Sequence, residues 1–498
     1  MLKLTTIVNN VCKRACGGSI STGVRESHVW TSENIVKSPF KDIEIPNSTF
    51  VEHVWKNLDK WPTKTATVCG ITGRQYTYEQ IYRQSQVLGA VLRKKFRIEN
   101  GDAVAIMLPN LPEYPTAIFG ILNAGGLVTT LNPNYTAYEV QRQINMSHTK
   151  LIIAYSEIVP TVKQALQLCK TKIPIIAINS ENPLPEGTVS YKEIIEDEHV
   201  DLNILREVER TADDVAFLPY SSGTTGLPKG VELTNYNIVA NVEQQNTEIK
   251  QYADTTVVVL FLGSHPQVQT KHFEHLRCVT SGAAPLPIAD IERFLEKVNP
   301  NSHFCQAYGL TETAPLATAS PLGYKEYSKV GFGIPNIELR IIDGNLNNRG
   351  PNEVGELLIK GPNVMKGYKD NEEANKQVFL DDGWLRTGDM AAIDELGAVT
   401  ISDRLKELIK VNAFQVPPAE LESVCKEHPA VIDAAVVPIP DSKTEPFMRE
   451  SDSTLVTPEG LWMRSVQAIR RPDWRSGVEH LVLGPEGVGS IPTTGKIL

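Results

Sequence analysis

The sequence predicts an α/β fold, in which a large N-terminal domain of doubly wound sheets is followed by a small α+β domain. The main observation is that short apolar runs alternate with stretches of helical periodicity over the first half of the chain. The length of 498 residues corresponds to about three domains at roughly 150 residues each, or to one large and one small domain. Hydrophobic residues make up 41% and charged residues 22%, an ordinary globular composition that supports a large core.

The first half of the chain supplies the alternating elements. Ile81, Leu88 and Leu92 recur at helical spacing and predict an amphipathic helix. The next apolar run ends at Pro109, which is typical of a buried strand. In chain order, the predicted elements are a helix over 76–96, a strand over 102–108, a helix over 114–124 and strands over 126–131, 150–155 and 173–178.

The second half is richer in turns and predicts a smaller unit at its end. Its expected elements are strands over 355–360 and 398–402, a short helix over 420–427 and a strand over 434–437. The last of these elements place a domain boundary near Asp403. We therefore divide the chain into a targeting or disordered segment 1–30, a large domain 31–402 and a small domain 403–498.

Composition and charge exclude several classes of protein. The net charge of −10 argues against general nucleic-acid binding, which needs a basic surface. Seven cysteines are too few and too irregularly spaced for a disulfide framework, and no apolar run is long enough to cross a membrane. The first 25 residues carry basic and small side chains but no acidic ones, as in a mitochondrial transit peptide. A disordered N-terminus without a signal is the alternative.

The segment 220–230 is rich in glycine and hydroxyl side chains, with the sequence Tyr-Ser-Ser-Gly-Thr-Thr-Gly-Leu-Pro-Lys-Gly. Such a segment can wrap backbone N–H groups and hydroxyls around phosphate oxygens, and Lys229 adds a positive charge. The spacing lacks the ending of a P-loop, so a P-loop nucleotidase is disfavoured. The candidate phosphate-binding residues are Ser221, Ser222, Gly223, Thr224, Thr225, Gly226 and Lys229.

Two further motifs carry groups suited to a nucleotide. In the segment 306–313, the Tyr308 ring can stack on a purine, Thr311 can donate to a phosphate oxygen and Glu312 is a hard oxygen ligand for Mg²⁺. In the segment 383–389, Asp389 can accept hydrogen bonds from two ribose hydroxyls, although an ordinary turn is the alternative.

These motifs, in this order, resemble the adenylate-forming (AMP-binding) superfamily. The branch they resemble most is that of 4-coumarate–CoA ligases, acyl-CoA synthetases and beetle luciferases. Other segments that carry the resemblance are 101–110, 132–136, 281–286 and 416–421. The resemblance extends from about residue 45 to 440 and reappears over 491–498. It implies an adenylate-forming domain of doubly wound sheets with a small C-terminal domain, which is incomplete in this chain.

The resemblance also implies an activity. Enzymes of this branch activate a carboxylic acid with ATP as an acyl-adenylate and then transfer the acyl group to coenzyme A. The implied substrates and cofactors are ATP, Mg²⁺, coenzyme A and a small carboxylic acid, with no nucleic-acid partner. Many relatives are peroxisomal, so the resemblance favours the peroxisome while the N-terminal composition favours the mitochondrion.

Individual residues take roles from the same resemblance. The implied nucleotide-binding residues are the seven of the segment 220–230 together with Ala283, Tyr308, Gly309, Asp389 and Arg404, and Glu312 is the implied metal ligand. Thr311 and Lys496 are implied to act in adenylation, and Lys410 in thioester formation. Lys406 matches the hinge about which the small domain rotates between the two half-reactions.

Two segments depart from the family pattern. The spacing between Lys229 and Ser281 is much shorter than in the family, which predicts an internal deletion of a strand, a helix and an aromatic-histidine motif. The segment 442–490 is rich in arginine, tryptophan and glycine and lacks clear strand or helix periodicity. These departures leave three functions open: an acid–CoA ligase, an impaired relative that only binds nucleotide, and a luciferase-like monooxygenase.

Overall fold

Three sheets organise the part of the chain that the computed structural model describes. The structure describes residues 29–179, 183–221, 228–247, 269–274, 276–282, 286, 288–404, 409–411, 414–416, 431–435, 466–470, 479–484 and 487–490, with the backbone alone after residue 402. Among these residues, no helix combines the length and the apolar character that crossing a membrane requires.

The largest sheet has nine strands and is doubly wound, as the sequence predicts. Its order is β10-β11-β9-β5-β4-β6-β7-β8, and β18 pairs with β11. The strands are β4 (Ala103–Met107), β5 (Leu127–Thr130), β6 (Leu151–Tyr155), β7 (Ile175–Ile178), β8 (Val189–Ser190), β9 (Val215–Phe217), β10 (Tyr220–Ser221), β11 (Lys229–Thr234) and β18 (Gly367–Tyr368). From β9 to β8 the neighbours run parallel. The chain adds β5 on one side of β4 and β6 on the other, so its winding direction reverses at β4.

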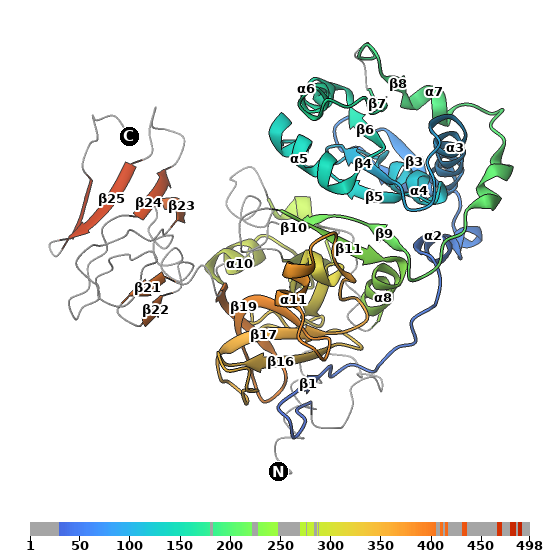
Figure 1. Ribbon diagram of the computed structural model, residues 1–498. Coiled ribbons are helices and arrows are strands. Elements are labelled where there is room, and N and C mark those ends of the chain that lie inside the picture. Colours follow the sequence, from blue (N-terminus) through green and yellow to red (C-terminus); the bar gives the residue numbers. More distant parts are fainter. Residues whose placement is uncertain are drawn as a thin grey trace.

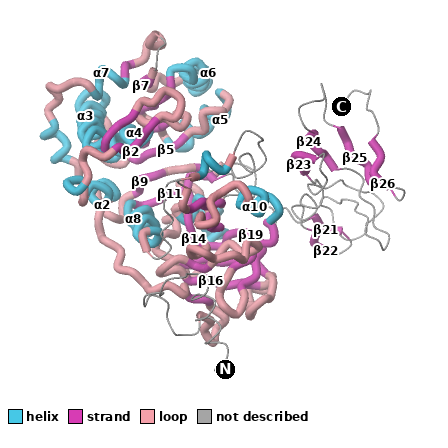
Figure 2. Tube along the Cα trace, turned by 180° about the vertical axis from the view of Figure 1, so that it is seen from behind, coloured by secondary structure: helices cyan, strands magenta, loops and turns pink. Residues whose placement is uncertain are grey.

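Both faces of this sheet are covered by helices. The helices are α3 (Tyr78–Phe96), α4 (Tyr114–Asn123), α5 (Ala137–Ser147), α6 (Val159–Cys169) and α7 (Tyr191–Ile195). Val104 and Ile106 of β4 pack in one core with α3, α4 and α7, whereas Ala105 and Met107 pack in another with α5 and α6. The alternation follows from the two-residue period of a strand. Both views show α5 and α6 on one side of the strands and α3 and α7 on the other (Figure 1 and Figure 2).

Helix α3 illustrates why the sequence forms these elements. It begins at a capping box in which the Gln80 N–H donates to the Thr77 hydroxyl and the Thr77 N–H donates to the Gln80 side chain. Two glycines let α3 and α4 approach closely. A Cβ on Gly89 would lie 2.8 Å from Cβ of Asn123, and one on Gly120 would lie 2.5 Å from Cδ2 of Leu88. The absence of a side chain at Gly120 makes room for the fully buried Leu88, and that at Gly89 makes room for Asn123 and the α4 backbone.

A second sheet is formed by strands that come after the glycine-rich segment 220–230 in the chain. It consists of β12 (Cys278–Ser281), β13 (His303–Gly309), β14 (Leu316–Ala319) and β15 (Phe332–Gly333), in that order. Strands β12 and β13 are parallel and joined through α10 (Ile288–Leu295). Within the described residues β12 pairs with β13 alone. The predicted deletion precedes β12, and residues 248–268 of that spacing lie outside the described residues, so its effect on this edge stays a prediction.

The third sheet is antiparallel and lies outside the doubly wound pattern that the sequence predicted for the large domain. It has the order β1-β16-β17-β19-β20, with β1 (Val36–Lys37), β16 (Glu338–Ile342), β17 (Gly355–Lys360), β19 (Leu385–Ile393) and β20 (Val399–Arg404). The predicted strands 355–360 and 398–402 correspond to β17 and β20. Strand β1 pairs with β16, and the Trp30 indole Nε1 donates to the Asp394 carbonyl at 2.8 Å. The N-terminal strand therefore belongs to a sheet made otherwise from residues after 337.

Smaller elements connect the sheets. They are α2 (Phe50–Trp55), α8 (Asn235–Gln245), α11 (Glu372–Val378), the hairpin β2 (Thr65–Val68) and β3 (Gln75–Thr77), and the 3₁₀ helices η1 (Leu58–Lys60), η2 (Ser156–Ile158), η3 (Leu202–Glu207), η4 (Thr270–Phe273) and η5 (Thr311–Thr313).

Beyond Arg404 the described backbone is all β. Strands β21 (Ile409–Val411) and β22 (Phe414–Val416) form a hairpin, and β23 (Val431–Ala435), β24 (Val466–Arg470), β25 (Glu479–Gly484) and β26 (Gly487–Ser490) form an antiparallel sheet. Three strands thus fall in the segment 442–490, where the sequence showed no strand periodicity. Their pairing follows backbone hydrogen bonds between successive strands, which need no alternating side-chain pattern. The predicted strand 434–437 is β23, which begins earlier, and the predicted helix 420–427 lies outside the described residues.

The packing of α3 against α4 gives a stability prediction. Replacing Leu88, which is 0% exposed, by alanine leaves a cavity that the two helices cannot close. We expect Leu88→Ala to lower the free energy of unfolding by about 2–5 kcal/mol, measured by urea denaturation. The matched control is Leu168→Ala on α6, where the side chain is 37% exposed and the loss should stay within about 1 kcal/mol. Equal losses in the two variants would contradict the packing assigned to Leu88.

Candidate active site

The two ends of the glycine-rich segment 220–230 lie side by side in paired strands. Strands β10 and β11 are antiparallel, with Tyr220 opposite Gly230 and Ser221 opposite Lys229. The residues between them, 222–227, are outside the described part of the chain. The pairing nevertheless holds the first hydroxyl residue and the lysine of the motif side by side. This arrangement is expected of a segment that surrounds a phosphate group.

Strand β18 brings an aromatic side chain to this hairpin. Val231 of β11 lies opposite Tyr368 of β18, and the Lys369 N–H donates to the Gly230 carbonyl at 2.9 Å. The Nζ atom of Lys229 lies 5.0 Å from the centre of the Tyr368 ring, within cation–π distance. The lysine is therefore supported by a ring face on its own sheet.

The same tyrosine reaches the predicted metal ligand. Its hydroxyl donates to Oε1 of Glu312 at 2.7 Å, and the Glu312 side chain is buried. Burial raises the pKa of the Tyr368 phenol, and the neighbouring Glu312 carboxylate raises it further. The phenol therefore keeps its proton at neutral pH and acts as the donor. Ser221, Lys229 and Glu312 are thus gathered around one ring.

Glu312 is suited to a magnesium ion that arrives with a nucleotide. Mg²⁺ in nucleotide sites takes one or two protein carboxylates and completes its shell with phosphate oxygens and water. The described residues contain no group of three or more His, Cys, Asp or Glu side chains that could hold a metal alone. The single buried carboxylate of Glu312 therefore fits a magnesium ion whose other ligands are phosphate oxygens and water.

A second polar pair lies at the ribose motif. The Tyr308 hydroxyl, from β13, donates to Oδ2 of Asp389 on β19 at 2.6 Å. Asp389 is 6% exposed, and in the β19–β20 ladder it lies opposite Arg404. The structure therefore unites the predicted purine-stacking and ribose-binding residues, which are 81 positions apart in the sequence.

An ion pair that sequence reasoning missed holds the part of β19 before Asp389, where the register with β17 shifts. The Arg386 guanidinium donates to both oxygens of Glu356, with Nη2 at 2.6 Å from Oε2 and Nε at 3.3 Å from Oε1. The Gly388 N–H also donates to Glu356, and the Asp389 N–H donates to the Thr387 hydroxyl. A glutamate at a buried position of the apolar run 355–360 is the one signal that could have predicted this pair.

Three buried asparagines, also missed, fix the turn after Glu312. Asn363 Nδ2 donates to the carbonyls of Thr313 and Leu316, and Asn241 Nδ2 donates to the Leu316 carbonyl. Asn237 on α8 donates to the carbonyls of Pro362 and Val364. The bonds from Asn363 and Asn241 satisfy backbone carbonyls of η5 and β14, and those from Asn237 hold the segment 362–364. The residues just after Glu312 are thereby held between α8 and the segment before β18.

A cleft of about 660 Å³ opens at the carboxyl ends of β4, β5 and β9, beside the glycine-rich hairpin. Its wall is neutral and polar, and includes Asn110, Asn132, Asn134, Tyr135, Gln143 and Tyr220. Parallel doubly wound sheets bind ligands at this end of their strands. The cleft is therefore contiguous with the site through Tyr220, which precedes Ser221.

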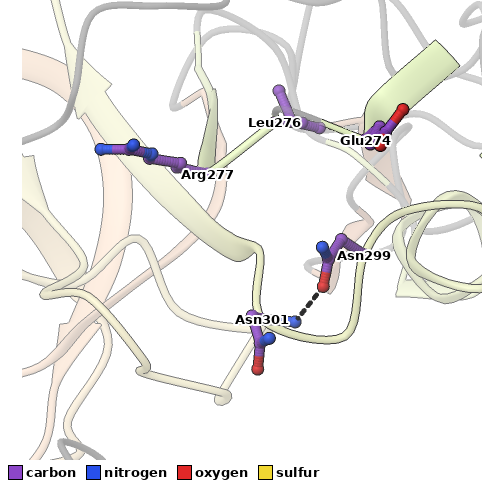
Figure 3. A pocket seen from close by; sticks show the side chains of 5 residues that line it. All are labelled: Glu274, Leu276, Arg277, Asn299 and Asn301. Carbon is purple, nitrogen blue, oxygen red and sulfur yellow. Dashed lines mark hydrogen bonds between the residues drawn. The ribbon is translucent and has the colours of Figure 1, made fainter. Parts of the chain in front are cut away.

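A smaller hollow of about 280 Å³ lies at the other end of the second sheet. Figure 3 shows Arg277, just before β12, and Asn299 and Asn301, just before β13, around it. In this view the Asn301 N–H donates to Asn299 Oδ1, at 2.9 Å, and Arg277 extends away from the other labelled side chains. The hollow lies at the amino ends of β12 and β13, whereas the residues of the motif 306–313 lie at the carboxyl end of β13. The hollow is therefore not part of the site.

The predicted residues divide into three groups. The structure brings together Ser221, Lys229, Tyr308, Gly309, Thr311, Glu312 and Asp389. A second group, Arg404 on β20 and Lys410 on β21, is described by its backbone alone. Outside the described residues are Ser222, Gly223, Thr224, Thr225, Gly226, Ala283, Lys406 and Lys496. The roles assigned to the residues of all three groups remain predictions from the sequence.

Comparison with known proteins identifies relatives of this chain by sequence. The sequence model of a family described as AMP-binding enzyme matches residues 54–263 and 252–369. The 4-coumarate–CoA ligase 1 of Arabidopsis thaliana is 32% identical over 479 residues, covering 83% of this chain and 85% of the relative. The 4-coumarate–CoA ligase 1 of Petroselinum crispum is 32% identical over 474 residues, with 82% and 85% covered.

Solved structures share the fold. ATP-bound MatB from Rhodopseudomonas palustris superposes with a TM-score of 0.70 at 23% identity, over 87% of this chain and 90% of that protein. The anthranilate CoA ligase AuaEII in complex with anthranoyl-AMP gives a TM-score of 0.72 at 20% identity, over 87% and 89%. At these identities the likeness shows the architecture, and the sequence relatives show the family.

The turn between Tyr308 and Glu312 gives a prediction about Gly309. A Cβ on Gly309 would overlap the Pro315 carbonyl oxygen, which belongs to the backbone and cannot rotate away. We expect Gly309→Ala to lower the free energy of unfolding by about 1–3 kcal/mol in urea denaturation. Gly344→Ala is the matched control, because nothing lies within 4 Å of a Cβ there. If both variants unfold at the same urea concentration as the wild type, the close approach at Gly309 is wrong.

Proposed function

Because the chain belongs to the family of AMP-binding enzymes, we propose that it joins a carboxylic acid to coenzyme A through an acyl-adenylate. In the first half-reaction a carboxylate oxygen attacks the α-phosphorus of ATP, the bond to the bridging oxygen breaks and pyrophosphate leaves. In the second, the coenzyme A sulfur attacks the acyl carbon and AMP leaves. The observation that carries this proposal is the convergence of Lys229, Glu312 and Asp389 from three distant motifs.

Different residues of the site would bind different parts of ATP. Lys229 and the hydroxyls of the glycine-rich hairpin would hold the departing phosphates, because they add positive charge and donors where negative charge leaves. Thr311 would donate to the α-phosphate. Mg²⁺ bound through Glu312 would neutralise phosphate charge and orient the triphosphate. Positioning and charge neutralisation of this kind supply most of the catalysis in phosphoryl chemistry.

The nucleoside would lie between Tyr308 and Asp389. The ring of Tyr308 offers a flat face for adenine, and its hydroxyl occupies one oxygen of Asp389. An ionised carboxylate accepts several hydrogen bonds, so Asp389 can still receive ribose hydroxyls. Arg404, opposite Asp389 on β20, and Ala283 and Gly309 complete the proposed nucleotide site.

The neutral cleft beside the hairpin would receive coenzyme A. Amide and hydroxyl groups such as those of Asn132, Asn134 and Tyr135 suit the amide-bearing arm of that molecule. We assign Lys496 to adenylation, where its ammonium would bridge the acyl carboxylate and the α-phosphate. Lys410 is assigned to thioester formation and Lys406 to the hinge between the two states.

A second candidate, nucleotide binding without ligation, has one observation in its favour. The family model matches this chain as two overlapping pieces that meet within residues 252–263, in the shortened spacing between Lys229 and Ser281. A shortened acyl-binding wall would leave the ATP site and impair the acid site. The 32% identity over most of the chain favours the ligase.

The compartment is a separate proposal. The basic, acid-free composition before residue 26 supports mitochondrial import, whereas the family resemblance supports the peroxisome. Fusing residues 1–30 to a fluorescent protein and imaging it in cells tests the first alternative. A diffuse signal would contradict it.

Two lysines separate the half-reactions in a direct test. We expect acid-dependent pyrophosphate release from ATP with a panel of aryl and fatty acids, followed by a coenzyme A thioester detected by mass spectrometry. Lys496→Ala should reduce pyrophosphate release by about 10²–10³-fold, because it removes a fixed charge where negative charge builds. Lys410→Ala should leave release intact and reduce thioester formation.

The control for both variants is Lys192→Ala, which removes a lysine that is 72% exposed on α7. It should match the wild type in both assays. Soluble, folded wild-type protein that releases no pyrophosphate with any acid would contradict the ligase and leave the nucleotide-binding alternative.

A further inference from the structure

We propose that Tyr368 is a positioning residue for the nucleotide's divalent cation: its hydroxyl holds the Glu312 carboxylate in the orientation that binds the metal. This inference rests on the proposed function, since it concerns how the same site binds metal-loaded ATP. Tyr368 lies on β18, outside every motif that predicted the site. It reaches Glu312 from 56 positions away in the sequence.

The carboxylate needs such a support. Glu312 is the middle residue of the 3₁₀ helix η5, and its side chain has several rotatable bonds. The Tyr368 hydroxyl donates to one oxygen, Oε1, at 2.7 Å. A carboxylate has a second oxygen, which can ligate a cation while the first stays bonded to the phenol. Hydrogen bonds of this kind orient metal ligands and strengthen metal binding.

Tyr368 is itself held rigidly. It pairs with Val231 in the β11–β18 ladder, its N–H donates to Oδ1 of Asn375 at 2.7 Å, and its carbonyl accepts from Nδ2 of the same asparagine at 3.0 Å. The Glu312 carbonyl accepts from the Met365 N–H at 2.8 Å, so the backbones of both partners are tied together. A rigid donor on a rigid backbone fixes the carboxylate better than a mobile side chain does.

The ring also separates two opposite charges. Lys229 Nζ lies 5.0 Å from the ring centre, while Glu312 is bonded at the phenol oxygen of the same ring. Among the ion pairs of the described residues there is none between Lys229 and Glu312. A direct pair would neutralise both groups before the nucleotide arrives. The tyrosine thus leaves the ammonium for phosphate and the carboxylate for metal.

The test removes only the hydroxyl. Tyr368→Phe keeps the ring beside Lys229 and deletes the donor to Glu312. In the full-length protein we would measure ATP affinity by calorimetry, once with excess Mg²⁺ and once with EDTA. We expect the variant to bind ATP in EDTA like the wild type and to bind Mg·ATP about 3–10-fold more weakly, as the loss of one hydrogen bond predicts.

A matched control carries the same bond at another place. The Tyr76 hydroxyl donates to Oε1 of Glu113 at 2.9 Å, and Glu113 is also buried, but this pair lies between β3 and α4. Glu113 is also paired with Arg74, whose Nε lies 2.7 Å from Oε1, so Tyr76→Phe reports the cost of removing a tyrosine donor from a buried glutamate that keeps a second partner. It should lower the thermal midpoint and leave the Mg²⁺ dependence of ATP binding unchanged.

A double-mutant cycle shows whether Tyr368 acts through Glu312. In the Glu312→Gln background, Tyr368→Phe should cause no further loss of Mg·ATP affinity, because the carboxylate that it orients is gone. If Tyr368→Phe alone folds poorly, the double variant can still be compared with Glu312→Gln, because it has no buried carboxylate that would be left unpaired.

The outcomes separate the two claims. Equal losses with Mg²⁺ and with EDTA, or an additive effect in the Glu312→Gln background, would overturn the role of Tyr368 while ATP binding by the wild type still supports the function. Folded wild-type protein that binds ATP under neither condition would contradict the proposed function and this inference with it.

Discussion

The backbone hydrogen bonds of β11 decide where the functional side chains meet. This one strand pairs with β10, which closes the glycine-rich hairpin, with β9, which joins it to the doubly wound sheet, and with β18, which carries Tyr368. Lys229 is its first residue and pairs with Ser221 of β10, while β18 and β9 pair with later residues of the same strand. The positions of Glu312 and of the segment leading to Asp389 follow from the same pairing, because β18 lies between them in the chain.

The electrostatics of the site follow from what its buried carboxylates are bonded to. Glu312 and Asp389 each accept a hydrogen bond from a tyrosine hydroxyl, whereas Glu356 is paired with an arginine. A neutral donor satisfies a carboxylate without cancelling its charge, and an ion pair cancels it. The bond from Tyr368 therefore satisfies Glu312 without cancelling the charge that a cation needs, and the Glu356–Arg386 pair holds the part of β19 before Asp389.

The sequence predicted most of the elements that local pattern determines. The apolar runs that became β4, β6 and β17 and the helical spacing that became α3 are properties of neighbouring residues, and the structure has them with ends shifted by a few positions. Ser221, Lys229, Glu312 and Asp389 were found because each lies in a recognisable short motif. Tyr368, the Glu356–Arg386 pair and Asn363 were missed because their roles depend on partners 30 to 56 positions away. No periodicity or spacing encodes such a contact, and only the fold brings the partners together.

The pairing of β1 with β16 constrains how this chain is made. Val36 leaves the ribosome early, but its strand partner Leu339 and the Asp394 carbonyl that binds Trp30 are synthesised some three hundred residues later. The doubly wound sheet contains neighbours close in sequence and can form while translation continues, because local contacts close short loops. The antiparallel sheet that carries Asp389 must wait for nearly the whole large domain to emerge. Its first strand remains without its partner until then, so during synthesis the ribose side of the site is completed after the phosphate side.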